Sequence, residues 1–151
     1  MKAALLTIFL VLPHLLYHCA ASTVVAGSAG STEQDSDAGL SDTEKQIRHG
    51  IVLLGKLCQC MAAVKDNDTA EAAVPEIMRL SEAFRQWPQG FTKLPPVSGL
   101  EALTYEERYM PTIRKINHII EAQAGRLAAA EYYGSRNLAA ALVRLAQTSQ
   151  P

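Results

Sequence analysis

The sequence predicts an all-α protein, an antiparallel helical bundle of three long helices and one short C-terminal helix. Apolar residues recur every three to four positions through three long stretches, as one buried face of a helix requires. Alanine and leucine are frequent between residues 41 and 147, and aromatic residues make up only 6% of the chain. The alternation of apolar and polar residues that is typical of strands is absent. Coiled-coil-like packing of helices is therefore the expected architecture.

The N-terminus has the three-part plan of a secretory signal peptide. Lys2 supplies a positive charge, an apolar run extends to Tyr17, and small residues follow. The run is too short to span a bilayer, which takes about 20 apolar residues. We therefore expect residues 1–21 to be a signal peptide and the protein to be exported to the bacterial periplasm or cell envelope.

Cys19 leaves a second processing scheme open, in which this cysteine receives a lipid as in a bacterial lipoprotein. Leu16 fits the lipoprotein pattern, whereas the large residues Tyr17 and His18 do not. Residues 22–40 are rich in Ser, Gly and acidic residues and are expected to form a flexible linker. A lipid on Cys19 would be the protein's contact with the membrane.

Residues 41–147 are expected to form the bundle. The first helix begins at Ser41 with an S-x-x-E capping box, in which the Glu44 carboxylate reaches back to the N-cap amide. It should end near Asp66, where turn-forming side chains cap the next helix. Its apolar stripe contains Ile47, Ile51, Leu54, Leu57, Cys58, Met61 and Val64.

The second helix is expected over residues 69–86, with a kink or a restart at Pro75. A Pro- and Gly-rich connection follows over residues 87–99. It is long for a helical hairpin, so we expect it to cross the end of the bundle.

The third helix opens with a second S-x-x-E box at Ser98 and should run to about Tyr132. Gly134 can supply a left-handed residue after it, and Ser135 can cap the short last helix. Residues 148–151 are expected to be a disordered tail.

Three short motifs and one proline resemble a known protein family. They are Val64–Asp66, Thr69–Glu71, Pro75 and Tyr132–Ser135. Their order resembles that in a family of small exported Ala-rich helical proteins of Verrucomicrobia and Planctomycetes. The resemblance covers most of residues 51–145. The family has no assigned activity, so the resemblance implies a helical fold and no catalytic residues.

Cys58, Cys60 and His49 are the weak candidates for metal binding in the first helix. His49 precedes Cys58 by nine residues, which is not a one-turn ligand spacing. Cys58 and Cys60 point to different sides of a helix, so they cannot bridge each other. We expect Cys58 to be a small core residue and Cys60 a boundary residue, with an intermolecular disulfide through Cys60 as the alternative.

Met61 and His118 are the weak candidates for haem or metal binding across the bundle. A Met and a His on facing helices are the ligand pair of four-helix cytochromes. A lone histidine is more often a hydrogen-bonded structural residue, so no cofactor or metal is expected. Glu106 and Glu107 are expected on a solvated helix face, and no hydrolase or phosphate-loop motif occurs, which predicts a protein without enzymatic activity.

The formal net charge of −1 gives no basic field for nucleic acid. Because export is expected and no catalytic motif occurs, the expected role is binding or scaffolding of another envelope protein or of a second copy. A haem or metal carrier and an envelope chaperone are the alternatives. Aromatic side chains anchor interfaces. The candidates for a partner surface are Trp87, Phe91, Tyr132 and Tyr133, which could also simply close the two ends of the bundle.

Overall fold

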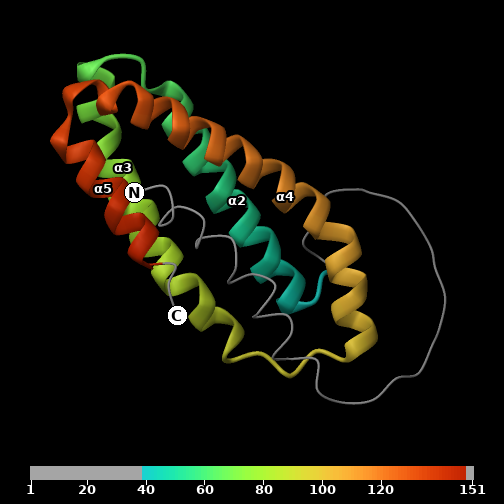
Figure 1. Cartoon of the computed structure of the whole chain (residues 1–151). Coiled ribbons are helices and arrows are strands. Elements are labelled where there is room, and N and C mark those ends of the chain that lie inside the picture. Colours follow the sequence, from blue (N-terminus) through green and yellow to red (C-terminus); the bar gives the residue numbers. More distant parts are fainter. Residues whose placement is uncertain (1–38, 149–151) are drawn as a thin grey trace.

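Four α-helices make up most of the part that the computed structural model describes, residues 39–148. They are α2 (Asp42–Ala63), α3 (Asn67–Phe91), α4 (Gly99–Ala129) and α5 (Arg136–Thr148), and the short turn η2 (Glu131–Gly134) joins the last two. Successive helices alternate in direction (Figure 1), and the predicted all-α bundle is confirmed. The predicted signal peptide with Cys19, most of the linker and residues 149–151 lie outside the described part.

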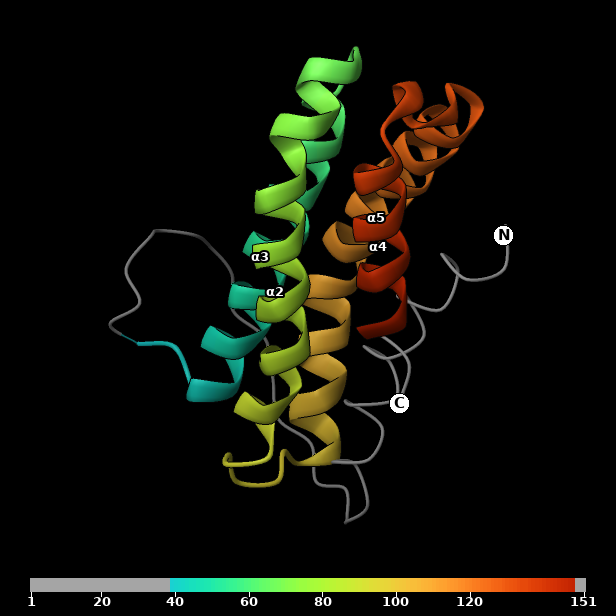
Figure 2. The same ribbon diagram turned by 90° about the vertical axis from the view of Figure 1, so that its left-hand side faces the viewer.

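The helices form two layers, with α2 and α3 in one and α4 and α5 in the other (Figure 2). Within this arrangement α2 packs against α3 and α4, and α5 packs against α3. Hydrogen bonds from α4 to both ends of α2, at Ser41 and Met61, show that these two neighbours run parallel. The segment that leaves α3 must therefore cross the end of the bundle to reach α4, as predicted. No helix within residues 39–148 is both long and apolar enough for a membrane span.

Side chains at the N-termini define where three of the helices begin. The hydroxyl of Ser41 accepts a hydrogen bond from the Glu44 amide at 3.1 Å, and Ser98 caps α4 in the same way. Asp66 and Thr69 form a complete capping box on α3. The predicted return bond from the Glu44 carboxylate to the N-cap is wrong, because this carboxylate bonds to α4 instead.

The core stripe of α2 follows the predicted periodicity with two shifts. Leu54, Leu57 and Met61 are buried on it, as expected. Ile51 and Cys58 are only half-buried, whereas Leu53, which lies outside the predicted stripe, is buried. The side chains of α2 that reach the core are Ile47, Leu53, Leu54, Leu57 and Met61, followed by Val64 at the C-cap.

Two predicted helix boundaries are corrected by the structure. Helix α3 does not restart at Pro75 and continues to Phe91. Pro75 is exposed on α3, where its missing N–H and its ring face solvent. Helix α4 ends at Ala129 rather than near Tyr132, because the backbone turns left-handed at Glu131.

Glu82 on α3 should make the protein less stable in acid. Arg85 and Gln86 donate hydrogen bonds to its carboxylate at 2.5–2.9 Å and lower its pKa from 4.5 to about 2. Because the folded-state pKa is depressed, this stabilisation is present above the unfolded pKa of 4.5 and is lost as the pH falls toward 2. In urea unfolding, the midpoint difference between wild type and Glu82→Gln should be larger at pH 6 than at pH 2.5. Glu107→Gln on an exposed face of α4 is the control and should show no such change; an equal pH dependence for both variants would contradict the prediction.

Candidate functional site: a cationic face on α2 and α4

A buried carboxylate in the first turn of α2 joins this helix to α4. The side chain of Glu44 is only 8% exposed and accepts hydrogen bonds from Arg108 Nη1 at 2.7 Å and from the hydroxyl of Tyr109. Arg48 Nε lies 3.4 Å from the same tyrosine hydroxyl. A buried charge is tolerated when it is paired and hydrogen-bonded. This cluster therefore fixes α4 against α2 and holds two guanidinium groups near the surface.

Tyr105 continues the cluster at the end of the bundle. Its hydroxyl lies 2.7 Å from the Ser41 hydroxyl and donates to Glu101 at 2.7 Å. Burial raises the pKa of Tyr105, with a smaller contribution in the same direction from Glu101. The phenol therefore stays protonated at physiological pH and acts as a hydrogen-bond donor.

An exposed surface adjoins this cluster along the line where α2 and α4 meet. Residues spaced by three, four or seven positions share one side of a helix, so the side of Glu44 on α2 and of Arg108 on α4 continues along both helices. We call this surface the α2–α4 face. It consists of Arg48, Val52, Gly55, Gln59, Arg108, Thr112, Lys115 and Ile119.

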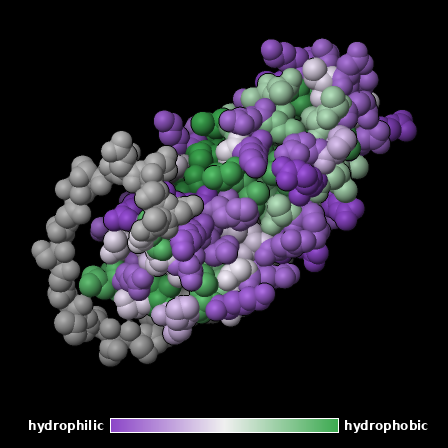
Figure 3. Space-filling view, turned by 180° about the vertical axis from the view of Figure 1, so that it is seen from behind, coloured by the Kyte–Doolittle hydropathy of each residue, from purple (hydrophilic) through white to green (hydrophobic). Residues whose placement is uncertain are grey.

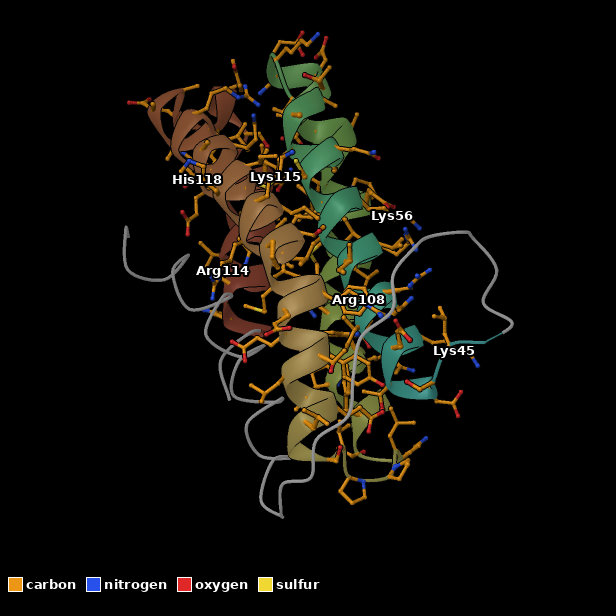
Figure 4. All side chains as sticks on the ribbon, turned by 90° about the vertical axis from the view of Figure 1, so that its right-hand side faces the viewer. Lys45, Lys56, Arg108, Arg114, Lys115 and His118 are labelled. Carbon is orange, nitrogen blue, oxygen red and sulfur yellow. The ribbon has the colours of Figure 1, made fainter. Side chains whose placement is uncertain are left out.

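The α2–α4 face carries basic and apolar side chains and no acidic one. Figure 4 looks onto it and shows Arg108 and Lys115 where the two helices meet, with Lys45 and Lys56 along the outer side of α2. Helix α2 has no acidic residue from Lys45 onward. At the centre of the face, Val52 is 51% and Ile119 38% exposed. The face therefore presents one exposed apolar side chain from each helix together with basic side chains from both.

Exposed apolar side chains also occur outside the α2–α4 face, as at Leu103 and Val143. In the view from behind, hydrophobic side chains gather near the middle of the molecule and hydrophilic ones cover much of the rest (Figure 3). Several exposed acidic side chains of α3 are paired with a neighbouring arginine, as Glu76 is with Arg79. Lys56 and Lys115 have no carboxylate within ion-pair distance among the described residues. The Lys115 ammonium group is therefore available to an external carboxylate, whereas that of Lys56 also interacts with Glu76, whose pKa is lowered first by the hydrogen bond from Arg79 and then by Lys56.

The structure does not bring together the predicted haem-ligand pair. Met61 is fully buried on the core side of α2. His118 lies on the outer side of α4, with its side chain 88% exposed and Nδ1 4.0 Å from Glu121. The expectation that these two residues could approach each other is wrong, because His118 is on the side of α4 that faces away from α2.

The cysteines and His49 are also separated. Cys58 and Cys60 are half-buried free thiols, and Cys60 Sγ donates to the Ala73 carbonyl at 3.8 Å. Burial raises the pKa of Cys60, and the nearby Glu76 carboxylate raises it further. His49 is exposed on α2. Within residues 39–148, no three His, Cys, Asp or Glu side chains form a group that could hold a metal ion.

The four aromatic candidates lie at opposite ends of the bundle. Trp87 is buried in α3, donates its indole N–H to the Gln46 carbonyl at 2.7 Å and contacts Phe91 edge to face. Tyr132 and Tyr133 are half-buried in η2, after the last residue of α4. The two pairs therefore do not form one surface, and Trp87 serves packing within the chain.

Arg126 on α4 has a structural role. Its guanidinium donates to the carbonyls of Met61 and Val64 at 2.8 Å and to the Tyr133 hydroxyl at 3.0 Å. It thus caps the C-terminus of α2 from the side of α4. A sequence-level signal for this role exists, because α2 has no basic residue in its own last turn.

Searches against protein-family models, curated proteins and solved structures found no significant match, so the resemblance in the short motifs stays a prediction.

Proposed function

We propose that the protein is an exported, non-enzymatic binding protein of the cell envelope, and that its α2–α4 face holds an acidic amphipathic helix of another envelope protein. The observation that supports the proposal is the exposure of Val52 and Ile119 beside basic side chains. Apolar residues at the centre with charged residues at the rim are typical of a docking surface. An amphipathic helix matches such a surface with its apolar face and its flanking charges.

The shape of the face favours a helical partner. Helices α2 and α4 run side by side in the same direction, so their exposed side chains form two parallel rows. Gly55 belongs to the row on α2, and space is left there because no neighbouring atom lies within 4 Å of the position that a Cβ would take. A third helix could lie along the rows and place apolar side chains on Val52 and Ile119.

The charges favour an acidic partner. Arg108 is 57% exposed while one of its nitrogens remains bonded to Glu44, which holds the guanidinium in a defined position. Lys115 is exposed about two helical turns further along α4. Preorganised charges add specificity and association rate, and their effect weakens with salt.

Site-specific photo-crosslinking in the envelope of the native host tests the proposal. A photoreactive phenylalanine analogue is placed at Val52 or at Ile119, and at His118 as a matched control on the outer side of α4. We expect one discrete heavier adduct from the first two positions and none from His118. Adding Lys115→Glu should reduce the adduct at least tenfold, which corresponds to about 1.4 kcal/mol.

Two results would contradict the proposal. One is the absence of an adduct at both face positions in protein that circular dichroism shows to be folded. The other is an adduct of equal yield at His118, since the contact would then not be specific to the α2–α4 face.

A further inference from the structure

The turn between α4 and α5 has an unusual backbone. Glu131, Tyr132 and Tyr133 have φ angles of 48°, 54° and 53°, and Gly134 follows at 79°. Residues with a side chain rarely adopt this left-handed region, and bulky ones are clear outliers in it. Three such residues in succession make η2 a strained turn.

Hydrogen bonds from two other elements hold this turn closed. The Asn67 side chain at the start of α3 donates to the Tyr133 carbonyl at 3.1 Å, and Arg126 donates to the Tyr133 hydroxyl. Opening the turn would cost these two bonds and relieve the strain at three residues.

The buried residues on either side of the turn are in phase. Near the end of α4 the core residues are Ile120, Ala124 and Leu127, and α5 begins its core contacts with Leu138. Leu127 and Leu138 are eleven residues apart, which is about three turns of an α-helix. If residues 130–135 were helical, Leu127 and Leu138 would lie on the same side of one helix, with Glu131 and Gly134 between them. In the closed chain the turn separates the two helices, so their common phase does not contribute to packing.

The arrangement of the two layers shows where a single straight helix made of α4 and α5 could pack. Helix α4 covers α2, α5 covers α3, and both lie in the same layer, without an extensive contact between them (Figure 2). In two copies related by a two-fold axis at the α4–α5 end, one straight helix could cover α2 of its own chain and α3 of the other. Both surfaces would then be on the same side of that helix, which requires its apolar residues to be in phase.

Helix α5 would keep its contacts in such a pair. Its buried side chains face α3, and Ser135 and Asn137 bond the Glu71 carboxylate of α3 at 2.7 and 2.9 Å. The packing of α5 and the bond from Asn137 can be made in the same way with α3 of a second copy, whereas Ser135 lies in the segment that opens. We therefore propose that the protein forms a dimer by exchanging α5, with η2 opening into a helix that joins α4 to α5. Strained hinge turns favour such exchange.

Two variants should move the monomer–dimer equilibrium in opposite directions. Gly134→Ala penalises the closed turn at φ 79° and favours a helix, so the dimer dissociation constant should fall roughly 100-fold or more, since both chains contribute. Tyr132→Gly/Tyr133→Gly relieves the closed turn and weakens the continuous helix, so the constant should rise by a similar factor. Size-exclusion chromatography with light scattering measures both.

A cross-linking experiment identifies the exchange itself. Cysteines replace Glu71 and Asn137 in a Gly134→Ala chain whose natural cysteines are changed to serine, and a short bifunctional thiol reagent joins them. In an exchanged dimer the reagent links two chains, whereas in an ordinary dimer it links residues of one chain.

The proposal is overturned if the Gly134→Ala protein stays monomeric up to millimolar concentration, or if its dimer cross-links only within chains. An unfolded Gly134→Ala protein also counts against it, because the exchanged dimer retains the core contacts of α4 and α5. A change of the same sign for both variants would show that η2 does not act as the hinge.

Discussion

Replacing Gly50 with alanine is expected to lower the free energy of unfolding by about 2 kcal/mol, although alanine is the better helix former by about 1 kcal/mol. A Cβ atom at Gly50 would lie 2.4 Å from Cζ2 and 2.6 Å from Cε2 of Trp87. The ring cannot move away easily, because its N–H is bonded to the Gln46 carbonyl at 2.7 Å. The overpacking and the weakened hydrogen bond therefore exceed the gain in helix propensity. Urea unfolding followed by circular dichroism measures the change.

Gly55→Ala on the same helix is the matched control. No atom lies within 4 Å of a Cβ at this position, so alanine should stabilise the protein by about 0.5–1 kcal/mol. In a Trp87→Leu background the penalty of Gly50→Ala should disappear, because the smaller side chain leaves room for the methyl group. A penalty that persists there would show that the close contact with the ring is not its cause.

The same contact shows what the sequence could predict and what it could not. The spacing of Ile47, Leu54 and Met61 predicts the buried side of α2 correctly, because a helix that packs on one side needs this period. The pattern does not reveal that Gly50 lies against Trp87. From the sequence alone, a glycine within a helical stripe only lowers the helix propensity. The close approach of Trp87 on α3 explains why a glycine occupies this position.

Helix ends were predictable where a local side chain decides them. Ser41, Asp66 and Ser98 accept the hydrogen bonds that their sequence motifs predict. The end of α4 could not be predicted in this way, since no local side chain prevents Tyr132 and Tyr133 from continuing the helix. The left-handed turn depends on Asn67, which is distant in the sequence.

The α2–α4 face could be predicted only in part. The absence of acidic residues after Glu44 in α2 is visible in the sequence. The sequence does not show which of the basic residues lie beside α4. That depends on the parallel pairing of α2 with α4, which the crossing connection and the bond between Glu44 and Arg108 establish. The net charge of −1 hides this local asymmetry.

Arg126→Met is expected to lower the free energy of unfolding by about 2–4 kcal/mol, since four hydrogen bonds from a charged donor, one of them to Gln123, are lost while the apolar stem is kept. Two of the acceptors are the carbonyls of Met61 and Val64, which end α2 beside the α2–α3 turn. A positive charge at a helix C-terminus also interacts favourably with the helix dipole. Thermal and urea unfolding measure the loss.

Arg126→Lys and Arg114→Ala separate the causes of that loss. Lysine keeps the charge but cannot reach two carbonyls and a phenol in the planar geometry of a guanidinium, so it should recover less than half of the stability. Arg114 is exposed on α4 and has no hydrogen bond within the described residues, so its alanine variant should change stability by less than about 0.5 kcal/mol. Full recovery by lysine would mean that the charge at the end of α2, and not the set of directed hydrogen bonds, is what stabilises the junction of α2, α4 and η2. The hinge proposal adds a further expectation, because Arg126 also donates to Tyr133: its loss should favour the open turn and raise the dimer fraction.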